Sequence, residues 1–240
     1  MKTVFCYAIN MQKLIDWLVD YTHLVKGHGL MFLYHKVPAH YLGHVVKEKV
    51  PVIILPGIFG RWAFLKPLAD HISLLGHPVY IVPKLGNNLH DIKRSSAMVR
   101  DMIEEQKIKK VIIVAHSKGG LIGKYLLAHD NKDNAVTGEI AVATPFSGSD
   151  LAKLVPHYSY KELAADSKMI QYLKTHTSVN KKIISIIPQY DNHVWHEDGS
   201  FLESALENIY VKDRGHHKLL SSKPVWEVIL KSLDKISRLK

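Results

Sequence analysis

The sequence predicts an α/β fold in which a mostly parallel central sheet is covered by helices on both faces. After Lys49, short runs rich in β-branched residues alternate with longer runs of helical periodicity. The short runs are apolar almost throughout, as strands buried on both faces require. One of them leads directly into a turn of small residues and then a helix. At 240 residues with 47% apolar content, the chain has the size of one compact domain with a large core.

The order of the elements follows from these runs. The expected strands are Pro51–Leu55, Val79–Val82, Val111–Val114, Ile140–Val142, Ile183–Ile187 and Asn208–Val211. The expected helices are Phe64–Leu75, Leu89–Gln106, Leu121–His129, Leu163–Leu173 and Val225–Ile236. We therefore expect residues 50–240 to form the α/β domain, with residues 1–49 packing on it as a helical and extended segment.

An amphipathic helix is expected over Met11–Val25. Its apolar residues recur at helical spacing, whereas Lys13, Asp16 and Asp20 lie elsewhere on the helical wheel. We favour a helix packed on the domain. A membrane-surface anchor is the alternative, and it is less favoured because the polar face is not distinctly basic.

Composition limits the partners. The formal charge of +10 indicates attraction to anionic surfaces such as acidic lipid headgroups. The basic residues are scattered and form no nucleic-acid-binding motif, so a nucleic-acid partner is not expected. The single cysteine, Cys6, excludes an intramolecular disulfide and a thiolate-rich zinc site. The apolar run Thr3–Ile9 has no cleavage signature, and charges interrupt the early apolar region. We expect a cytoplasmic protein, with peripheral contact to an anionic membrane surface as a further option.

The clearest chemical signal surrounds Ser117. The strand Val111–Val114 runs into Ala115, and Ser117 is followed by Gly119 two residues later. Small residues at these two positions let a strand and a helix meet at a sharp turn that points the serine outward above the sheet. The backbone N–H of Lys118 would then point at an oxyanion from the start of the helix. Ser117 is therefore a candidate nucleophile.

The segment 115–119 resembles the Ala-x-Ser-x-Gly nucleophile elbow of small bacterial lipases and esterases in the α/β-hydrolase superfamily. Residues 55–60 resemble the loop that supplies the second oxyanion donor in that family, with Pro56 where histidine is frequent. The resemblance implies the backbone N–H of Ile58 as this donor, with Phe59 as the less favoured choice. An ordinary glycine turn is the alternative interpretation of this loop.

Residues 143–149 are similar to the Thr-Pro-His-x-Gly-Ser segment of lipases, with Phe146 in place of the histidine. The substrate pocket is expected to include Phe59, Trp62 and Phe146. Phe64 and Trp195 belong either to the same crevice or to the core.

The acid and base of a triad are expected at the ends of two later strands. Asp191 follows Ile183–Ile187, and His216 follows Asn208–Val211 and Gly215. The chain order Ser117, Asp191, His216 is that of α/β-hydrolases, and the interval between acid and base leaves room for one helix and one strand. The competing residues are His217 for the base, and Asp198 and Asp213 for the acid.

The resemblance implies a serine hydrolase that cleaves carboxylic esters, and among them acyl lipids, through an acyl-enzyme intermediate. No cofactor is required, because nucleophile, base and oxyanion donors are all protein groups. Two alternatives are an acyltransferase that uses the same triad and a non-catalytic binding protein of the same fold.

Two further segments carry alternatives. Residues 146–180 lie between two expected strands and are interpreted as a lid-like insertion, with an ordinary helical excursion as the alternative. The side chains of metal-ligand type that follow the fifth strand lack a His-Glu-x-x-His pattern, so a solvated loop is preferred to a metal site. They are Asp191, His193, His196, Glu197 and Asp198.

Overall fold

The computed structural model describes residues 11–196 and 198–239. The predicted features at Thr3–Ile9, Cys6 and Glu197 lie outside these residues. Six strands form one sheet of order β2-β1-β3-β4-β5-β6, in which every neighbouring pair is parallel. They are β1 (Val52–Leu55), β2 (Val79–Ile81), β3 (Val111–His116), β4 (Val136–Val142), β5 (Ile183–Tyr190) and β6 (Glu207–Arg214).

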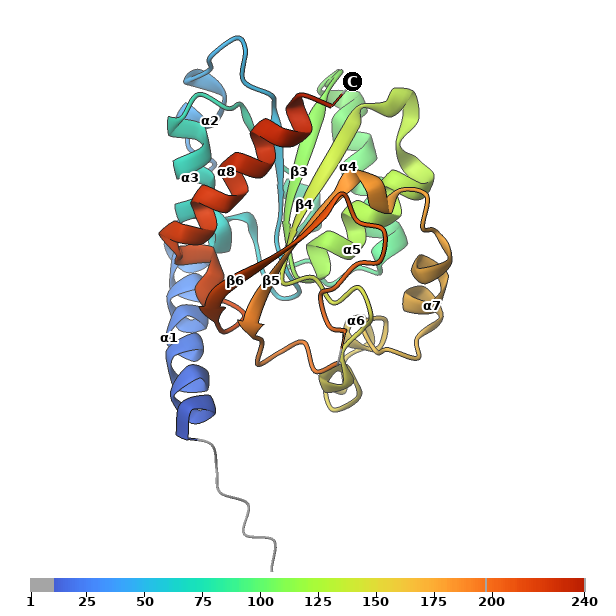
Figure 1. Ribbon diagram of the computed structural model, residues 1–240. Helices are drawn as coiled ribbons and strands as arrows, with labels where there is room; N and C mark the ends of the chain where they lie inside the picture. The colour runs from blue at the N-terminus through green and yellow to red at the C-terminus, as the bar shows by residue number, and fades with distance from the viewer. Residues whose placement is uncertain (1–10, 197, 240) are drawn as a thin grey trace, which may run out of the picture.

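Helices cover both faces of this sheet, as the sequence predicted (Figure 1). On one face lie α4 (Ile92–Glu105) and α5 (Lys118–Tyr125), and on the other α3 (Lys66–Leu74) and α8 (Lys223–Ser237). Successive residues of β1 alternate between the two cores. Both cores are apolar, which explains why the strands read as continuous hydrophobic runs.

The short elements complete the fold. They are α2 (His40–Gly43), α6 (Tyr158–Lys161), α7 (Lys168–Thr175), a π-helical turn over Leu126–Asp130 and six 3-10 turns at Trp62–Leu65, Pro83–Leu85, Lys132–Asn134, Asp150–Lys153, Asn180–Lys182 and Lys218–Ser221.

Several expected boundaries are wrong, each for a local reason. The helix α5 begins at Lys118, earlier than expected, because the turn at Ser117 leads straight into it. The helix expected over Leu163–Leu173 begins only at Lys168, because the Ser167 hydroxyl accepts a hydrogen bond from the Ile170 N–H at 3.1 Å and caps the helix there. The helix expected between Asp191 and His216 is replaced, in the described residues, by turns and irregular loop.

The N-terminal helix turns its acidic side, and not its apolar side, toward the domain. The helix α1 (Met11–Leu33) exists and is longer than expected, but its buried residues are Asp16, Asp20 and Gly27. Several of its apolar side chains face away from the domain, among them Leu18 and Val25, which are 62% and 69% exposed. The reason is that both carboxylates pair with groups of the C-terminal part of the chain, so that the acidic side faces the domain. No helix within the described ranges is long and apolar enough to cross a bilayer.

The insertion over residues 146–180 divides into two parts. The helix α7 packs Ile170 and Leu173, which are at most 1% exposed, into the same core as α5. The preceding part consists of one 3-10 turn, the short α6 and loops, with Leu154 and Tyr158 largely exposed. Only this first part has the construction expected of a lid.

Candidate active site

Ser117 lies at a sharp turn between β3 and α5. Its backbone has φ 54° and ψ −123°, a conformation that residues with a Cβ rarely adopt. A Cβ added to Gly119 would lie 2.6 Å from the carbonyl oxygen of Leu55, so glycine permits α5 to come this close to β1. The Ser117 N–H donates to the Val142 oxygen at 2.9 Å. The turn therefore fixes Ser117 at the carboxyl edge of the sheet.

The loop after β1 lies against this turn. A Cβ added to Gly57 would lie 3.1 Å from the Cβ of Ser117, and the following Ile58 and Phe59 line the same cavity as Ser117. The Asn88 side-chain amide donates to the Pro56 carbonyl oxygen at 2.7 Å and so holds the loop from behind. Sequence reasoning missed Asn88. The signal in the sequence is the run Gly86-Asn87-Asn88, which is typical of a turn, and in the structure Asn88 has the positive φ that asparagine tolerates.

Lys118 follows Ser117 and begins α5. Its side chain is fully buried and turned away from the cavity, with Nζ donating to the carbonyl oxygens of Asn88 and His90. Burial lowers the pKa of this ammonium group to about 8. The Lys118 side chain therefore supports the 88–90 loop, and only its backbone N–H lies beside the serine.

Asp191 and His216 meet where β5 and β6 end. Nδ1 of His216 lies 2.9 Å from Oδ2 of Asp191, and both side chains are at most 10% exposed. Oδ1 of Asp191 accepts the N–H groups of His193 and Val194 at 2.7 and 2.9 Å. The Asn192 side chain accepts the His216 N–H at 3.1 Å. These bonds fix both the carboxylate and the imidazole.

The pKa values of this pair shift in opposite directions. Burial alone would lower the pKa of His216, but the Asp191 carboxylate raises it above the usual value. Burial would raise the pKa of Asp191, but His216 and the two backbone N–H donors hold it below its usual range. The structure therefore favours an ionised carboxylate beside an imidazole that readily accepts a proton.

Three further imidazoles surround His216. The ring centroids of His116, His193 and His217 lie 4.6, 5.0 and 5.0 Å from that of His216. Burial, and then the charge of His216, lowers the pKa of His116 well below the usual value and that of His193 to about 3. The pKa of His217 is also lowered, chiefly by burial. Among these four imidazoles, His216 is the one whose surroundings favour the protonated form.

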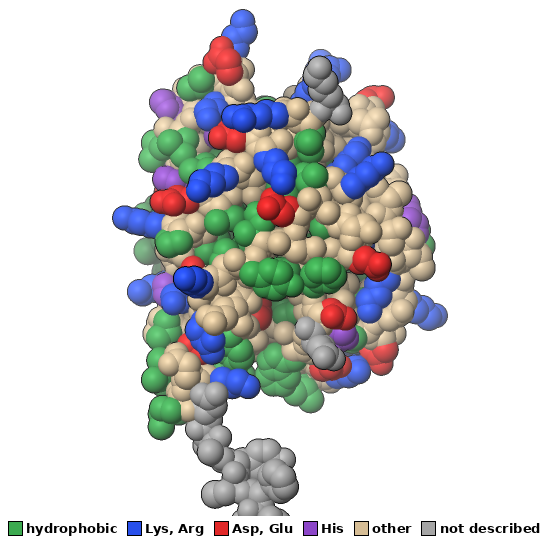
Figure 2. Space-filling model, in the orientation of Figure 1, with side chains coloured by type: hydrophobic (Ala, Val, Ile, Leu, Met, Phe, Trp, Pro, Cys, Tyr) green, Lys and Arg blue, Asp and Glu red, His purple; other side chains and the backbone are tan. Residues whose placement is uncertain are grey.

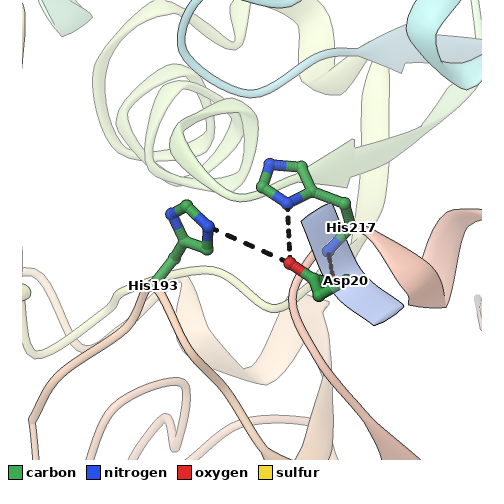
Figure 3. Close-up of side chains that lie close together, drawn as sticks. All are labelled: Asp20, His193 and His217. Atoms are coloured by element: carbon green, nitrogen blue, oxygen red, sulfur yellow. Dashed lines mark hydrogen bonds and ion pairs between the residues drawn. The ribbon is translucent and has the colours of Figure 1, made fainter. Parts of the chain in front are cut away.

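His217, the competing base, pairs with a different carboxylate. Its Nδ1 lies 2.9 Å from Oδ2 of Asp20 on α1, and Nε2 of His193 lies 3.9 Å from the same oxygen (Figure 3). Oδ1 of Asp20 accepts the backbone N–H groups of His217 and Lys218 at 2.7 and 2.9 Å. Asp20 thus attaches α1 to the loop that carries His216. Nothing in the sequence around Asp20 indicated this partner.

Asp20, His193 and His217 are also the one trio of metal-ligand type that the described residues bring together, with ligand atoms within 4.8 Å of one another. It differs from the metal cluster considered from the sequence. Asp191 of that cluster pairs with His216, and Nδ1 of His196 accepts the backbone N–H of Asp198 at 3.2 Å. Both oxygens of Asp20 already have protein donors, so hydrogen bonds account for the Asp20–His217 part of the trio, whereas Nε2 of His193 is buried and makes no hydrogen bond in the described residues.

Ser117, His216 and the loop at Ile58 line one cavity of about 370 Å³. Its walls come from several parts of the chain. The helix α1 contributes Leu24, His28 and Met31. The loop after β1 contributes Ile58 and Phe59, and the 3-10 turn that follows it contributes Phe64. The first part of the insertion contributes Ser149, Leu151, Ala152, Tyr160 and Leu163. The cavity is thus a mostly apolar space with the serine and histidine in its wall.

Two aromatic residues expected in the substrate pocket lie elsewhere. Phe146 is 4% exposed and belongs to the core beside α5, with Nζ of Lys124 5.8 Å from its ring centroid. Trp62 packs edge to face on Tyr41, with ring centroids 6.1 Å apart. Trp195, left open between crevice and core, packs on Trp17 of α1 instead. Phe59 and Phe64 do line the cavity.

Comparisons with known proteins establish the fold. No protein-family model and no curated protein matches the chain. The lipase BlEst2 of Bacillus licheniformis, in its mature form, matches with a TM-score of 0.66 and 17% identity over 80% of this chain and 95% of that chain. A metagenome-derived lipolytic enzyme of the LipS and LipT pair matches with a TM-score of 0.61 and 14% identity over 80% of this chain and 96% of that chain. The monoacylglycerol lipase of Paleococcus ferrophilus matches with a TM-score of 0.58 and 12% identity over 79% of this chain and 96% of that chain. The predicted α/β-hydrolase fold is confirmed.

Proposed function

We propose that this chain is a serine hydrolase that cleaves carboxylic esters, with Ser117 as nucleophile, His216 as base and Asp191 as the carboxylate that orients the base. The observation that carries the proposal is that His216, which is paired with Asp191, lines the same cavity as Ser117 at its strained turn. A strained serine beside a carboxylate-paired histidine is the arrangement that activates a hydroxyl for attack on a carbonyl.

The reaction follows from these groups. The Ser117 hydroxyl attacks the ester carbonyl carbon while Nε2 of His216 accepts its proton. Asp191 keeps the Nδ1 proton in place and stabilises the imidazolium. The backbone N–H groups of Ile58 and Lys118 stabilise the tetrahedral oxyanion, and loss of one such donor typically costs about 10²–10³ in kcat. His216 then protonates the leaving alcohol, and water releases the acid from the acyl-enzyme by the same steps in reverse.

The cavity wall supports an acyl chain as the acid part of the ester. Leu24, Met31, Phe64, Leu151 and Leu163 surround the space next to Ser117. Apolar side chains of this kind bury a hydrocarbon tail and give no directional hydrogen bonds. We therefore infer a preference for esters with an apolar acyl chain.

A panel of p-nitrophenyl esters of increasing chain length tests the proposal. The wild-type chain should hydrolyse them and be labelled by a fluorophosphonate probe, whereas Ser117→Ala should lose both properties and keep the fold. Labelling that persists in Ser117→Ala would refute Ser117 as the nucleophile. Adding a competing alcohol to the same assay separates hydrolysis from acyl transfer.

A further inference from the structure

The outward side of α1 is an apolar stripe. Leu14, Leu18, Val25 and Phe32 follow one another at intervals of four or seven residues, so they share one face of the helix. They are 45%, 62%, 69% and 79% exposed. Met11, Ile15 and Leu33, also exposed, widen this stripe. In Figure 2 hydrophobic side chains lie along the left edge, where Figure 1 places α1. A continuous exposed apolar surface of this kind marks a contact with another apolar phase.

The opposite side of α1 fixes the stripe in this orientation. Asp16 pairs with Arg214 at 2.7 Å, and Asp20 accepts three hydrogen bonds from His217 and Lys218. Nε1 of Trp17 donates to the Tyr190 hydroxyl at 2.7 Å. Rotating α1 to bury its apolar side would break these bonds. It would leave Arg214 and the buried donors of His217 and Lys218 without their carboxylate acceptors. The helix therefore presents its hydrophobic residues outward by construction.

The charges around the stripe are cationic. Both carboxylates of α1 are buried in pairs. Lys26 is exposed directly after Val25 of the stripe, whereas Lys13 lies on the other side of the helix, with Nζ 5.9 Å from the Tyr190 ring centroid. In the adjoining residues 34–49, Lys36 and Lys47 are exposed, with Glu48 as the exposed acid. The face thus combines apolar side chains with an excess of positive charge, and the whole chain has the same sign at +10. This combination is complementary to an anionic lipid surface.

We propose that α1 is an interfacial helix that seats the protein on an anionic lipid bilayer. The apolar stripe enters the boundary between headgroups and acyl chains, and the lysines contact anionic headgroups. Leu24, His28 and Met31 of the same helix line the cavity, so the helix that docks also forms part of the wall of the proposed active site. The inference goes beyond the proposed ester hydrolysis, since docking requires no turnover.

Vesicle flotation of the full chain tests docking. We use the Ser117→Ala chain so that no lipid is hydrolysed, with vesicles of phosphatidylcholine alone or mixed with phosphatidylglycerol. The protein should float with the mixed vesicles and much less with the neutral ones. The double variant Leu18→Glu/Val25→Glu should lower partitioning at least about tenfold, because it places two charges within the stripe. Lys26→Gln/Lys36→Gln should reduce the preference for anionic vesicles.

The matched control is Leu74→Glu/Leu239→Glu. It replaces two leucines that are 63% and 50% exposed, one at the end of α3 and one just after α8, and it changes the net charge by the same amount as the stripe variant. This control should float like the parent chain, and circular dichroism should show all variants folded. With Ser117 intact, Leu18→Glu/Val25→Glu should still hydrolyse a water-soluble short-chain ester, so failure of docking and failure of hydrolysis are separate results.

Three results would overturn the proposal. The parent chain could fail to float with anionic vesicles, or the stripe variant could float as well as its control. Light scattering could instead show a dimer that Leu18→Glu/Val25→Glu converts to a monomer, with no vesicle binding by the parent. The stripe would then be a contact between two copies of the chain.

Discussion

Asp20 and His217 lie 197 residues apart in the chain, yet Oδ2 of Asp20 is 2.9 Å from Nδ1 of His217. The neighbouring Asp191–His216 pair has the same 2.9 Å separation. The two pairs differ in what they hold: Asp191 orients the proposed base, whereas Asp20 attaches α1 to the loop that carries it. A Cβ on Gly215, which has φ 114°, would lie 2.6 Å from Oδ1 of Asp20, so glycine is needed at this close approach. The N-terminal helix is therefore part of the scaffold of the site.

Removing the Asp20 carboxylate should destabilise the protein. Asp20→Ala leaves the N–H groups of His217 and Lys218 and the His217 ring without their acceptor, and it creates a cavity. We expect the free energy of unfolding to fall by about 3–5 kcal/mol in urea denaturation. Asp234→Ala, at an exposed position of α8, should change it by no more than about 0.5 kcal/mol. Equal effects of the two substitutions would contradict the buried attachment.

The proposed base should be visible in the pH profile. Only neutral His216 accepts a proton from Ser117, and Asp191 raises the pKa of His216. The acidic limb of kcat/KM should therefore lie above the usual histidine value of about 6.5. Asp191→Asn should move that limb to lower pH and reduce kcat. An unshifted limb in Asp191→Asn would show that another group titrates.

The two adjacent histidines should differ sharply. His216→Ala should lower kcat/KM by at least about 10³-fold, because the neighbouring imidazoles, whose pKa values are lowered, are weaker bases. His217→Ala should retain most activity and instead lose stability, since His217 pairs with Asp20. Equal losses of activity in two folded variants would leave His217 as a rival base.

The surrounding histidines make stability depend on pH. The folded state lowers the pKa of His116, His193 and His217, so the unfolded chain binds more protons below about pH 6.5. Their contribution is present above that pH and is lost as the pH falls. His216, with a raised pKa, acts in the opposite direction. We expect a net loss of stability between pH 7 and about pH 5.

His193→Asn tests this dependence. It removes one of the buried neutral imidazoles, so the difference between urea midpoints at neutral and mildly acidic pH should become smaller. His44→Asn, at an exposed position, should leave that difference unchanged. A slope that stays the same in His193→Asn would assign the pH dependence to other groups.

The sequence could predict features whose contacting residues are close together in the chain, but not features that depend on residues far apart in it. The turn at Ser117 was predictable because its requirements, Ala115 and Gly119, are local. The meeting of Asp191 and His216 followed from strand order, since parallel strands end at the same edge. The orientation of α1 could not be predicted in this way. Periodicity places Asp16 and Asp20 on the polar side, and only contacts with Arg214 and His217 near the other end of the chain turn that side inward.

The supporting residues of the site were also beyond local inference. Asn88 holds the loop at Pro56, and Asn192 holds the His216 backbone, through hydrogen bonds that cross between separate loops. Phe146 was assigned to the pocket from its place in a motif, but the chain turns it into the core. Whether a side chain lies in the pocket or in the core depends on packing between segments that are far apart in the sequence, and a sequence pattern does not contain this information.

The close approach of α5 to β1 should be sensitive to one methyl group. Gly119→Ala would put a Cβ 2.6 Å from the Leu55 oxygen and 2.9 Å from the Pro56 oxygen, both backbone atoms. We expect a loss of about 1–3 kcal/mol in the free energy of unfolding, with reduced activity. Gly29→Ala in α1 meets nothing within 4 Å and should instead stabilise the helix by up to about 1 kcal/mol. Similar effects of the two would refute the close approach.

The insertion should be mobile only in its first part. Residues 150–163 have short helical turns, an exposed Leu154 and Tyr158, and cavity-lining residues such as Leu151 and Tyr160. The buried side chains of this segment, Ala152, Ser159 and Leu163, stand between exposed turns. We therefore expect it to open at a lower free-energy cost than α7, which Ile170 and Leu173 anchor along one helix.

Hydrogen exchange on the free protein distinguishes the two parts. Amides of residues 150–163 should exchange fast and become slower when a phosphonate with a long acyl chain occupies Ser117, because the chain would contact this segment. Amides of α7 should be protected in both states. Protection of residues 150–163 equal to that of the central strands before any ligand is added would instead make this segment a fixed wall of the cavity.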